Sequence, residues 1–217
     1  MDGFNFYKAC LTGSQHKWLN ICSLFEEITR AIEPDSDLIL VKYFTARVKG
    51  SYCKNPASPD RQSKYLIALQ KFNSETIEVI EGTHVEVFTA GKHVVDGVTT
   101  NNWLDFCKME EKQTDVNIAL NMYRDCSQRK CEQVVLVSND SDLKTALAFI
   151  KEDFPEVRRG LIQPNQSRPS KTLADLSHWT RRGIQSEDLR RHQLPDEVEY
   201  KNLGGRKTKR SKKPEGW

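Results

Sequence analysis

Two aspartates follow a strongly hydrophobic segment in the stretch VVLVSNDSDL (Val134–Leu143). Its β-branched residues predict a buried strand, and the chain leaves that strand at Asp140 and Asp142. Capping of the next helix is an alternative explanation, but a single acid is enough for a cap. Two carboxylates beside Ser138 and Asn139 offer several oxygen ligands in a short segment, which favours a site for a hard divalent cation.

A second acidic position lies in the segment TDVNIALNMYRDC, which predicts a helix over residues 114–126. At about 100° per residue, Asp115 falls on the same face as Val116 and the other apolar residues, at the first turn, and Asn121 falls on the opposite, solvent side. Glu111 shares the face of Asp115 if the helix begins one turn earlier. The helix dipole also favours an acid in the first turn, but it does not select a face.

The start of the chain, MDGFN, adds Asp2 and Asn5, although Asp2-Gly3 by itself is also an ordinary turn signal. Carboxylates at close range raise one another's pKa unless a cation neutralises them. Oxygen ligands without His or Cys favour Mg²⁺ or Mn²⁺. Such an ion would lower the pKa of a bound water and make it a nucleophile that can attack a phosphodiester.

The acids must be positioned by strands and helices, and predicted strands and helices alternate along the chain. This alternation predicts an α/β fold, a three-layer sandwich with a mainly parallel central sheet of PIN-like or Rossmann-like type. In such sheets the carboxyl ends of the strands meet at one edge, where ligands bind. The polar stretch Gly91–Thr114 is expected to be a long loop, in which Trp103 and Phe106 either stack bases or anchor the loop to the body. The predicted strands are 37–48, 83–91, 132–138 and 157–164, and the predicted helices are 14–33, 58–80, 114–126 and 140–154.

The composition is that of a globular protein, with 217 residues, 37% hydrophobic and 29% charged. The six cysteines show no zinc spacing, and neither a signal peptide nor an apolar segment of membrane length is present, so a cytoplasmic protein is expected. The net charge is +3, but the basic residues are concentrated near the C-terminus. Lys201–Lys213 holds seven Lys or Arg, and without them 26 basic residues stand against 30 acidic ones.

We therefore expect a domain over residues 1–166 and a C-terminal helical extension with a basic tail over 167–217. The tail is either an ordinary solvated segment or a phosphate-attracting one, in which Lys207, Lys209 and Arg210 would contact RNA. The terminal Trp217 could dock on the body and hold the tail in place.

The stretches DGFNFY, EEKQTDVNIAL and VVLVSNDSDL, in this order, resemble those of NYN domain proteins, which belong to the PIN-like nuclease superfold. The resemblance implies a metal-dependent ribonuclease. It implies that Asp2, Asp115 and Asp140 bind the metal, that Asp142 and Asn5 are secondary ligands or orient water, and that Lys112 touches a phosphate. The chain departs from the family at its start, because the hydrophobic strand that precedes the first motif is almost absent before Asp2.

The favoured function is therefore cleavage of RNA phosphodiester bonds, with single-stranded RNA as the preferred substrate and endonuclease action as the preferred mode. The predicted catalytic residues are Asp2, Asp115, Asp140 and Asp142. The predicted supporting residues are Asn5, Glu111, Ser138 and Asn139. The first alternative is a catalytically weak or inactive RNA-binding module of the same fold. The second is a small-molecule oxidoreductase, ranked last because no Gly-x-Gly-x-x-Gly motif and no haem or flavin signature is present. The oligomeric state is open, with a homodimer as one option.

Overall fold

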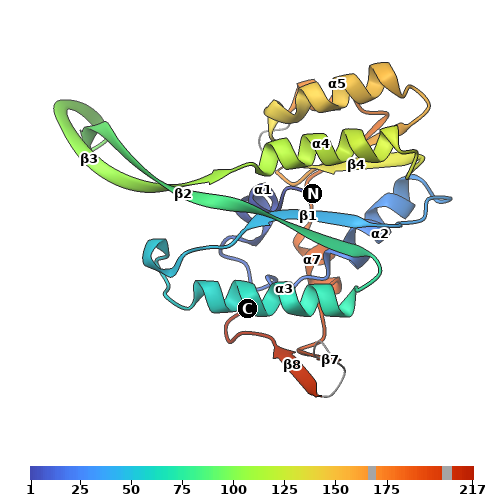
Figure 1. Ribbon diagram of the computed structural model, residues 1–217, viewed down its shortest axis with the longest axis horizontal. Coiled ribbons are helices and arrows are strands. Elements are labelled where there is room, and N and C mark those ends of the chain that lie inside the picture. Colours follow the sequence, from blue (N-terminus) through green and yellow to red (C-terminus); the bar gives the residue numbers. More distant parts are fainter. Residues whose placement is uncertain (166–169, 202–206) are drawn as a thin grey trace.

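The computed structural model describes residues 1–165, 170–201 and 207–217, and these form an α/β fold (Figure 1). The strands are β1 (Val41–Ala46), β2 (Ile77–Val95), β3 (Val98–Lys112), β4 (Gln133–Val137), β5 (Arg158–Gln163), β6 (Trp179–Arg182), β7 (Glu197–Lys201) and β8 (Thr208–Lys212). The α-helices are α1 (Gly3–Phe6), α2 (Ile21–Ile32), α3 (Ser58–Phe72), α4 (Thr114–Ser127), α5 (Lys144–Asp153), α6 (Lys171–Ala174) and α7 (Ser186–Arg191). Three short irregular helices are η1 (Tyr7–Leu11), η2 (Gly50–Tyr52) and η3 (Ser141–Leu143).

Residues Met1 and Asp2 join two sets of parallel strands. β1 pairs with β2, and β4 pairs with β5, which pairs with β6. Between β1 and β4, Asp2 forms a parallel bridge with Phe44, and its backbone N–H donates to the carbonyl of Val137 at 3.1 Å. The strand that the sequence almost lacks is thus reduced to Met1 and Asp2, which still hold the central position and link β1 to β4.

Helices cover the two faces of this sheet and enclose two hydrophobic cores. One core contains residues of α2, α3 and α7, including Leu24, Leu69 and Leu189. The other contains residues of α4 and α5, including Ile118 and Leu147. Figure 1 shows α4 and α5 above the strands and α3 and α7 below them. This arrangement is compatible with the three-layer sandwich that the alternating pattern predicts.

Two predictions about the segment after α3 were wrong. The helix expected to reach residue 80 ends at Phe72, because a turn follows and Ile77–Ile80 then pair with β1 as the start of β2. The loop expected over Gly91–Thr114 is mostly strand β3. Asp96-Gly97, both with positive φ (49° and 80°), forms the tight turn between β2 and β3, and such a turn suits a two-residue hairpin.

The basic C-terminal run is not a free tail, because its described part forms strand β8, which pairs antiparallel with β7. Arg210 makes ion pairs with Glu197 at 2.9 Å and Glu199 at 2.8 Å. The prediction for Trp217 is confirmed, since its ring packs 6.1 Å from that of Tyr65. The expected boundary at 166/167 lies outside the described residues. Within the described residues, no helix is long and apolar enough to cross a membrane.

Candidate functional site

Five acidic side chains gather at the carboxyl ends of the strands, and we call them the acidic edge: Asp2, Glu111, Asp115, Asp140 and Asp142. Their proximity is evident at Asp115, whose pKa is raised by partial burial and then by the charges of the other four acids. The structure therefore brings together the acids that the sequence singled out from three distant segments. Their catalytic role stays a prediction.

Asp2 is the most buried of the five and is held by a close approach of the chain to β1. Its carboxylate caps α1, with Oδ1 accepting from the Asn5 N–H at 2.9 Å and Oδ2 accepting from the Ser138 hydroxyl at 3.1 Å. Burial raises the pKa of Asp2, and these two hydrogen bonds oppose the rise. A Cβ on Gly3 would lie 2.6 Å from the carbonyl oxygen of Phe44, so this approach requires glycine.

The polar residues around β4 connect the first and last acidic motifs. Asn5 accepts a hydrogen bond from the Asn139 N–H at 3.1 Å, and the buried Ser138 hydroxyl accepts one from the Asp140 N–H at 3.0 Å. Asp140 also caps the short helix η3, because its Oδ1 accepts from the Asp142 N–H at 3.0 Å. Asp140 is thus a helix cap, as the alternative explanation in the sequence analysis proposes. The carboxylate of Asp142 does not cap this helix.

Helix α4 brings Asp115 to the edge through an unusual start. Gln113, the residue before the helix, has a φ of 77°, and the Thr114 hydroxyl donates to the carboxylate of Glu111. A Cβ on Gly82 would lie 2.6 Å from Thr114 Oγ1, so glycine in β2 makes room for the helix start. Asp115 follows in the first turn, where the dipole also favours an acid.

The predicted orientation of α4 was partly wrong. Val116, assigned to the buried face, is exposed, while Ile118, Met122 and Cys126 form the buried stripe. Asn121, assigned to the solvent side, accepts a hydrogen bond from Lys42 Nζ at 3.1 Å. The helix packs against both α5 and β1, so its buried stripe is rotated away from the one that hydrophobicity alone indicates.

The acidic edge does not have the form of a ready metal site. Among residues 1–165, 170–201 and 207–217, no group of three His, Cys, Asp or Glu side chains is placed to hold a metal ion. Mg²⁺ or Mn²⁺ at this edge therefore stays a prediction.

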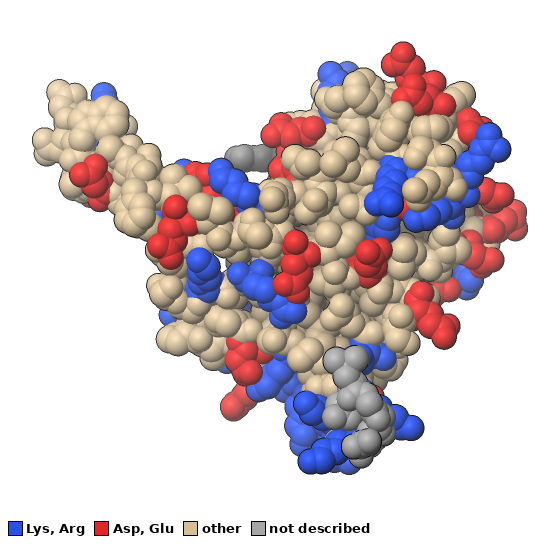
Figure 2. Space-filling model, in the orientation of Figure 1, with Lys and Arg blue, Asp and Glu red and all other residues tan. Residues whose placement is uncertain are grey.

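The lysines and arginine expected to contact RNA are not gathered at the acidic edge. Lys112 ends β3 and pairs with Glu110 at 2.6 Å, next to Glu111. Lys207 precedes β8, and Lys209 and Arg210 lie within it. Figure 2 shows Lys and Arg side chains around this hairpin, on the side of the molecule opposite to α4 and α5. RNA as a partner stays a prediction.

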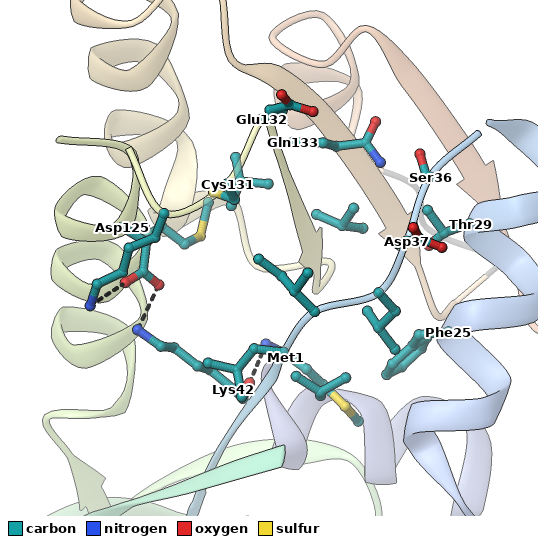
Figure 3. A pocket seen from close by; sticks show the side chains of 18 of the residues that line it. Met1, Phe25, Thr29, Ser36, Asp37, Lys42, Asp125, Cys131, Glu132 and Gln133 are labelled. Atoms are coloured by element: carbon teal, nitrogen blue, oxygen red, sulfur yellow. Dashed lines mark hydrogen bonds and ion pairs between the residues drawn. The ribbon is translucent and has the colours of Figure 1, made fainter. Parts of the chain in front are cut away.

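A separate cleft opens at the amino ends of β1 and β4, where Met1 is the last residue between them (Figure 3). Its volume is about 610 Å³, within the range of roughly 300–1,000 Å³ that small-molecule sites occupy. Apolar side chains form much of its wall, among them Phe25, Met122 and Val135.

The polar part of the cleft centres on an ion pair between β1 and α4. Lys42 Nζ lies 2.6 Å from Asp125 Oδ2, and the two side chains keep only 16% and 18% of their surface exposed. Asp125 Oδ1 is buried without a hydrogen bond, although Lys130 approaches it to 3.7 Å. Figure 3 shows Lys42 reaching toward Asp125 on one wall, with Ser36 and Thr29 on the opposite wall.

Sequence reasoning missed this cleft. Its lining comes from residues 25–44, 121–135 and single positions elsewhere, and no local motif marks it. The available signal was the shortened central strand before Asp2, since a sheet that lacks most of a middle strand leaves space between its neighbours.

The fold and these two features define an α/β protein with a charged edge and a cleft suited to a small molecule. No family model matches the chain. The chain is 34% identical over 242 aligned positions to the 6-hydroxy-3-succinoylpyridine 3-monooxygenase HspA of Pseudomonas putida, and the match covers 100% of this chain and 73% of that protein. The chain belongs to the family of this monooxygenase.

A solved structure of a protein of unknown function from Vibrio parahaemolyticus is also similar, with a TM-score of 0.49 and 15% identity. The match covers 85% of this chain and 89% of that one. The resemblance to NYN domain proteins stays a prediction.

The prediction of a metal-dependent ribonuclease is wrong, and with it the description of the chain as a nuclease and hydrolase. The relative that matches the whole chain is named as a monooxygenase, which is an oxidoreductase. The physical reason for the error is that a group of carboxylates fixes the charge of a site but not the reaction that occurs there. This relative supports the oxidoreductase alternative, which the sequence analysis places last.

Proposed function

We propose that the protein is an oxidoreductase of the monooxygenase class that hydroxylates a small aromatic molecule bound in the cleft between β1 and β4. The observation that carries the proposal is the 34% identity to a monooxygenase along the whole chain. The cleft supports it, because its volume and its mixed apolar and polar lining match those of a small-molecule site.

The substrate named for the relative is a hydroxypyridine with a succinoyl chain, which combines a flat ring with a carboxylate. Such a molecule needs apolar walls for the ring and a cation for the acid. The cleft offers Phe25 and Val135 for the ring. Lys42 and Arg158 are paired with Asp125 and Glu33, so Arg129 is the cation of the lining that we assign to the carboxylate. The acidic edge would repel the carboxylate, whereas the lining of the cleft sets four Lys or Arg against five Asp or Glu, so the repulsion is weaker in the cleft than at the edge.

A monooxygenase inserts one oxygen atom of O₂ into the substrate and reduces the other to water, which consumes two electrons and two protons. The electrons come from a donor, commonly through a flavin or a metal. The described residues contain no metal-binding group, and the sequence has no Gly-x-Gly-x-x-Gly motif. The role assigned to the residues of the cleft is therefore binding of the substrate, and the two electrons are supplied by an added donor in the test below.

The test is conversion of 6-hydroxy-3-succinoylpyridine under ¹⁸O₂, with reduced nicotinamide and reduced flavin supplied in separate reactions. We expect one ¹⁸O atom in the product, detected by mass spectrometry, and oxygen uptake that depends on the substrate. Absence of labelled product with every donor, while the substrate binds, would contradict hydroxylation. Absence of binding as well would contradict both the activity and this substrate class.

Variants locate the site. Ser36 lies on a loop at the cleft, so Ser36→Trp narrows the cleft and is expected to raise KM at least tenfold. Ser74→Trp places the same side chain on an exposed turn elsewhere and is the matched control. Asp140→Asn tests the acidic edge. If Asp140→Asn abolished binding and Ser36→Trp did not, the substrate would bind at the edge and the assignment of the cleft would be wrong.

A further inference from the structure

The hairpin of β2 and β3 extends far beyond the body of the protein. β2 pairs with β1 from Ile77 to Gly82, and from Thr83 onward it pairs only with β3. Figure 1 shows the two strands projecting past α1 and α3, and Figure 2 shows the outer part almost free of charged side chains. We call residues 83–112 the arm.

Large apolar side chains are exposed on both faces of the arm. Phe88, opposite Cys107, and Trp103, opposite Lys92, share one face by the strand register. Phe106, opposite Thr89, lies on the other face, as do Leu104 and Val85. The exposed fractions are 80% for Phe88, 64% for Trp103 and 47% for Phe106.

An isolated two-stranded hairpin in water is only marginally stable, and a projecting one with apolar side chains on both faces cannot cover them with its own body. β3 is also the outer strand of its sheet, and within the described part of the chain its free edge pairs with nothing. Residues 77–112 contain no proline that would block pairing at that edge. The arm therefore has both an apolar surface and a backbone edge available to a partner.

We propose that the arm is a dimerisation element, in which the arms of two copies of this chain pack together about a two-fold axis. The charge of the arm favours a second copy over a polyanion. Residues 87–107 carry one Lys and two Asp, so two arms repel each other little, whereas nucleic acid or an anionic membrane would require a basic surface.

The exposed aromatic side chains of two arms supply about half of the surface area that a stable dimer interface buries. An aromatic side chain buries about 150–250 Å², so the exposed parts of Phe88, Trp103 and Phe106 amount to roughly 300–450 Å² on one arm. Two arms supply twice this area, about half of the roughly 1,600 Å² that a standard interface buries. The exposed valines and Leu104 add to it.

The test is the mass of the full chain in solution, by light scattering and sedimentation velocity over a range of concentrations. We expect a dimer for the native protein and a monomer for the Phe88→Asp/Trp103→Asp double variant. The matched control is Leu120→Asp/Phe149→Asp, which changes two side chains of comparable exposure, 63% and 53%, on α4 and α5. The control is expected to stay dimeric.

A second variant removes the outer arm without relying on charge. Val87 and Lys108 face each other across the hairpin, so residues 88–107 can be replaced by Asn-Gly, which closes a two-residue turn. We expect this variant to be folded by circular dichroism and monomeric by light scattering. A monomeric native protein at all concentrations, or a dimer of either arm variant, would overturn the proposal.

Discussion

Replacement of Lys42 by Met should destabilise the fold, because it leaves the Asp125 carboxylate in the wall of the cleft without its main partner. The two side chains are 2.6 Å apart and largely shielded from water. Breaking a buried ion pair on one side typically costs about 3–5 kcal/mol, whereas removal of both charges is often neutral. Lys130, at 3.7 Å from Asp125, offers partial compensation. We therefore expect Lys42→Met to lower the free energy of unfolding by about 2 kcal/mol.

Urea unfolding followed by circular dichroism gives this free energy, with the m-value as a check that the unfolding transition is comparable. The double variant Lys42→Met/Asp125→Leu removes both charges and should recover to within about 1 kcal/mol of the native protein. Lys54→Met, at an exposed position, is the control and should change stability by less than about 0.5 kcal/mol. The reasoning fails if the double variant is no more stable than Lys42→Met.

Three further predictions concern the acidic edge. The pKa of Asp115 is raised in the folded state, so its contribution to stability is present below the unfolded pKa, about 3.9, and is lost as the pH rises through the folded value. Asp115→Asn should therefore stabilise the fold more at pH 7 than at pH 3, and only slightly, because solvent screens this exposed side chain. Gly3→Ala should cost about 2 kcal/mol in urea unfolding, because its Cβ would meet the Phe44 carbonyl. Mn²⁺ should bind weakly at the edge, with a Kd on the order of 1 mM by calorimetry, and Asp140→Asn should weaken it at least tenfold.

Each of these predictions has its control. Asp96→Asn removes one charge at the tip of the arm, away from the acidic edge, and is the control for the loss of a single carboxylate. Gly50→Ala should be tolerated, because its Cβ would lie 3.6 Å from the nearest atom. Equal Mn²⁺ affinity of the native protein and Asp140→Asn would show that the ion binds elsewhere.

The convergence of the acids could be predicted because it follows from a general rule of α/β sheets. Asp140 comes three residues after the end of a hydrophobic strand, and the carboxyl ends of parallel strands meet at one edge. The position of Asp2 could not be predicted with the same security. Two residues are too few for a periodic pattern, and they are placed by hydrogen bonds to β1 and β4, which are distant in the sequence.

The arm and the cleft depend on information that local patterns carry poorly. The segment 73–80 could be read as the end of a helix, and only its pairing with β1 makes Ile77–Ile80 a strand. Asp96-Gly97, between Val95 and Val98, is a hairpin signal, but the many polar residues of Gly91–Thr114 as a whole favour a loop. The cleft arises from a space between strands, and the types of the residues that line it do not predict that space.

The two candidate sites share one short segment, and this determines which variants can distinguish them. Met1 lines the cleft, and the next residue, Asp2, belongs to the acidic edge and caps α1. A substitution at Asp2 would therefore disturb the cleft through the backbone as well as the charge of the edge. Asp140 lies after β4 and does not line the cleft, so a loss of activity in Asp140→Asn with binding retained would assign the edge a part in the reaction. If Asp140→Asn kept full activity and Ser36→Trp raised KM, the reaction would be assigned to the cleft.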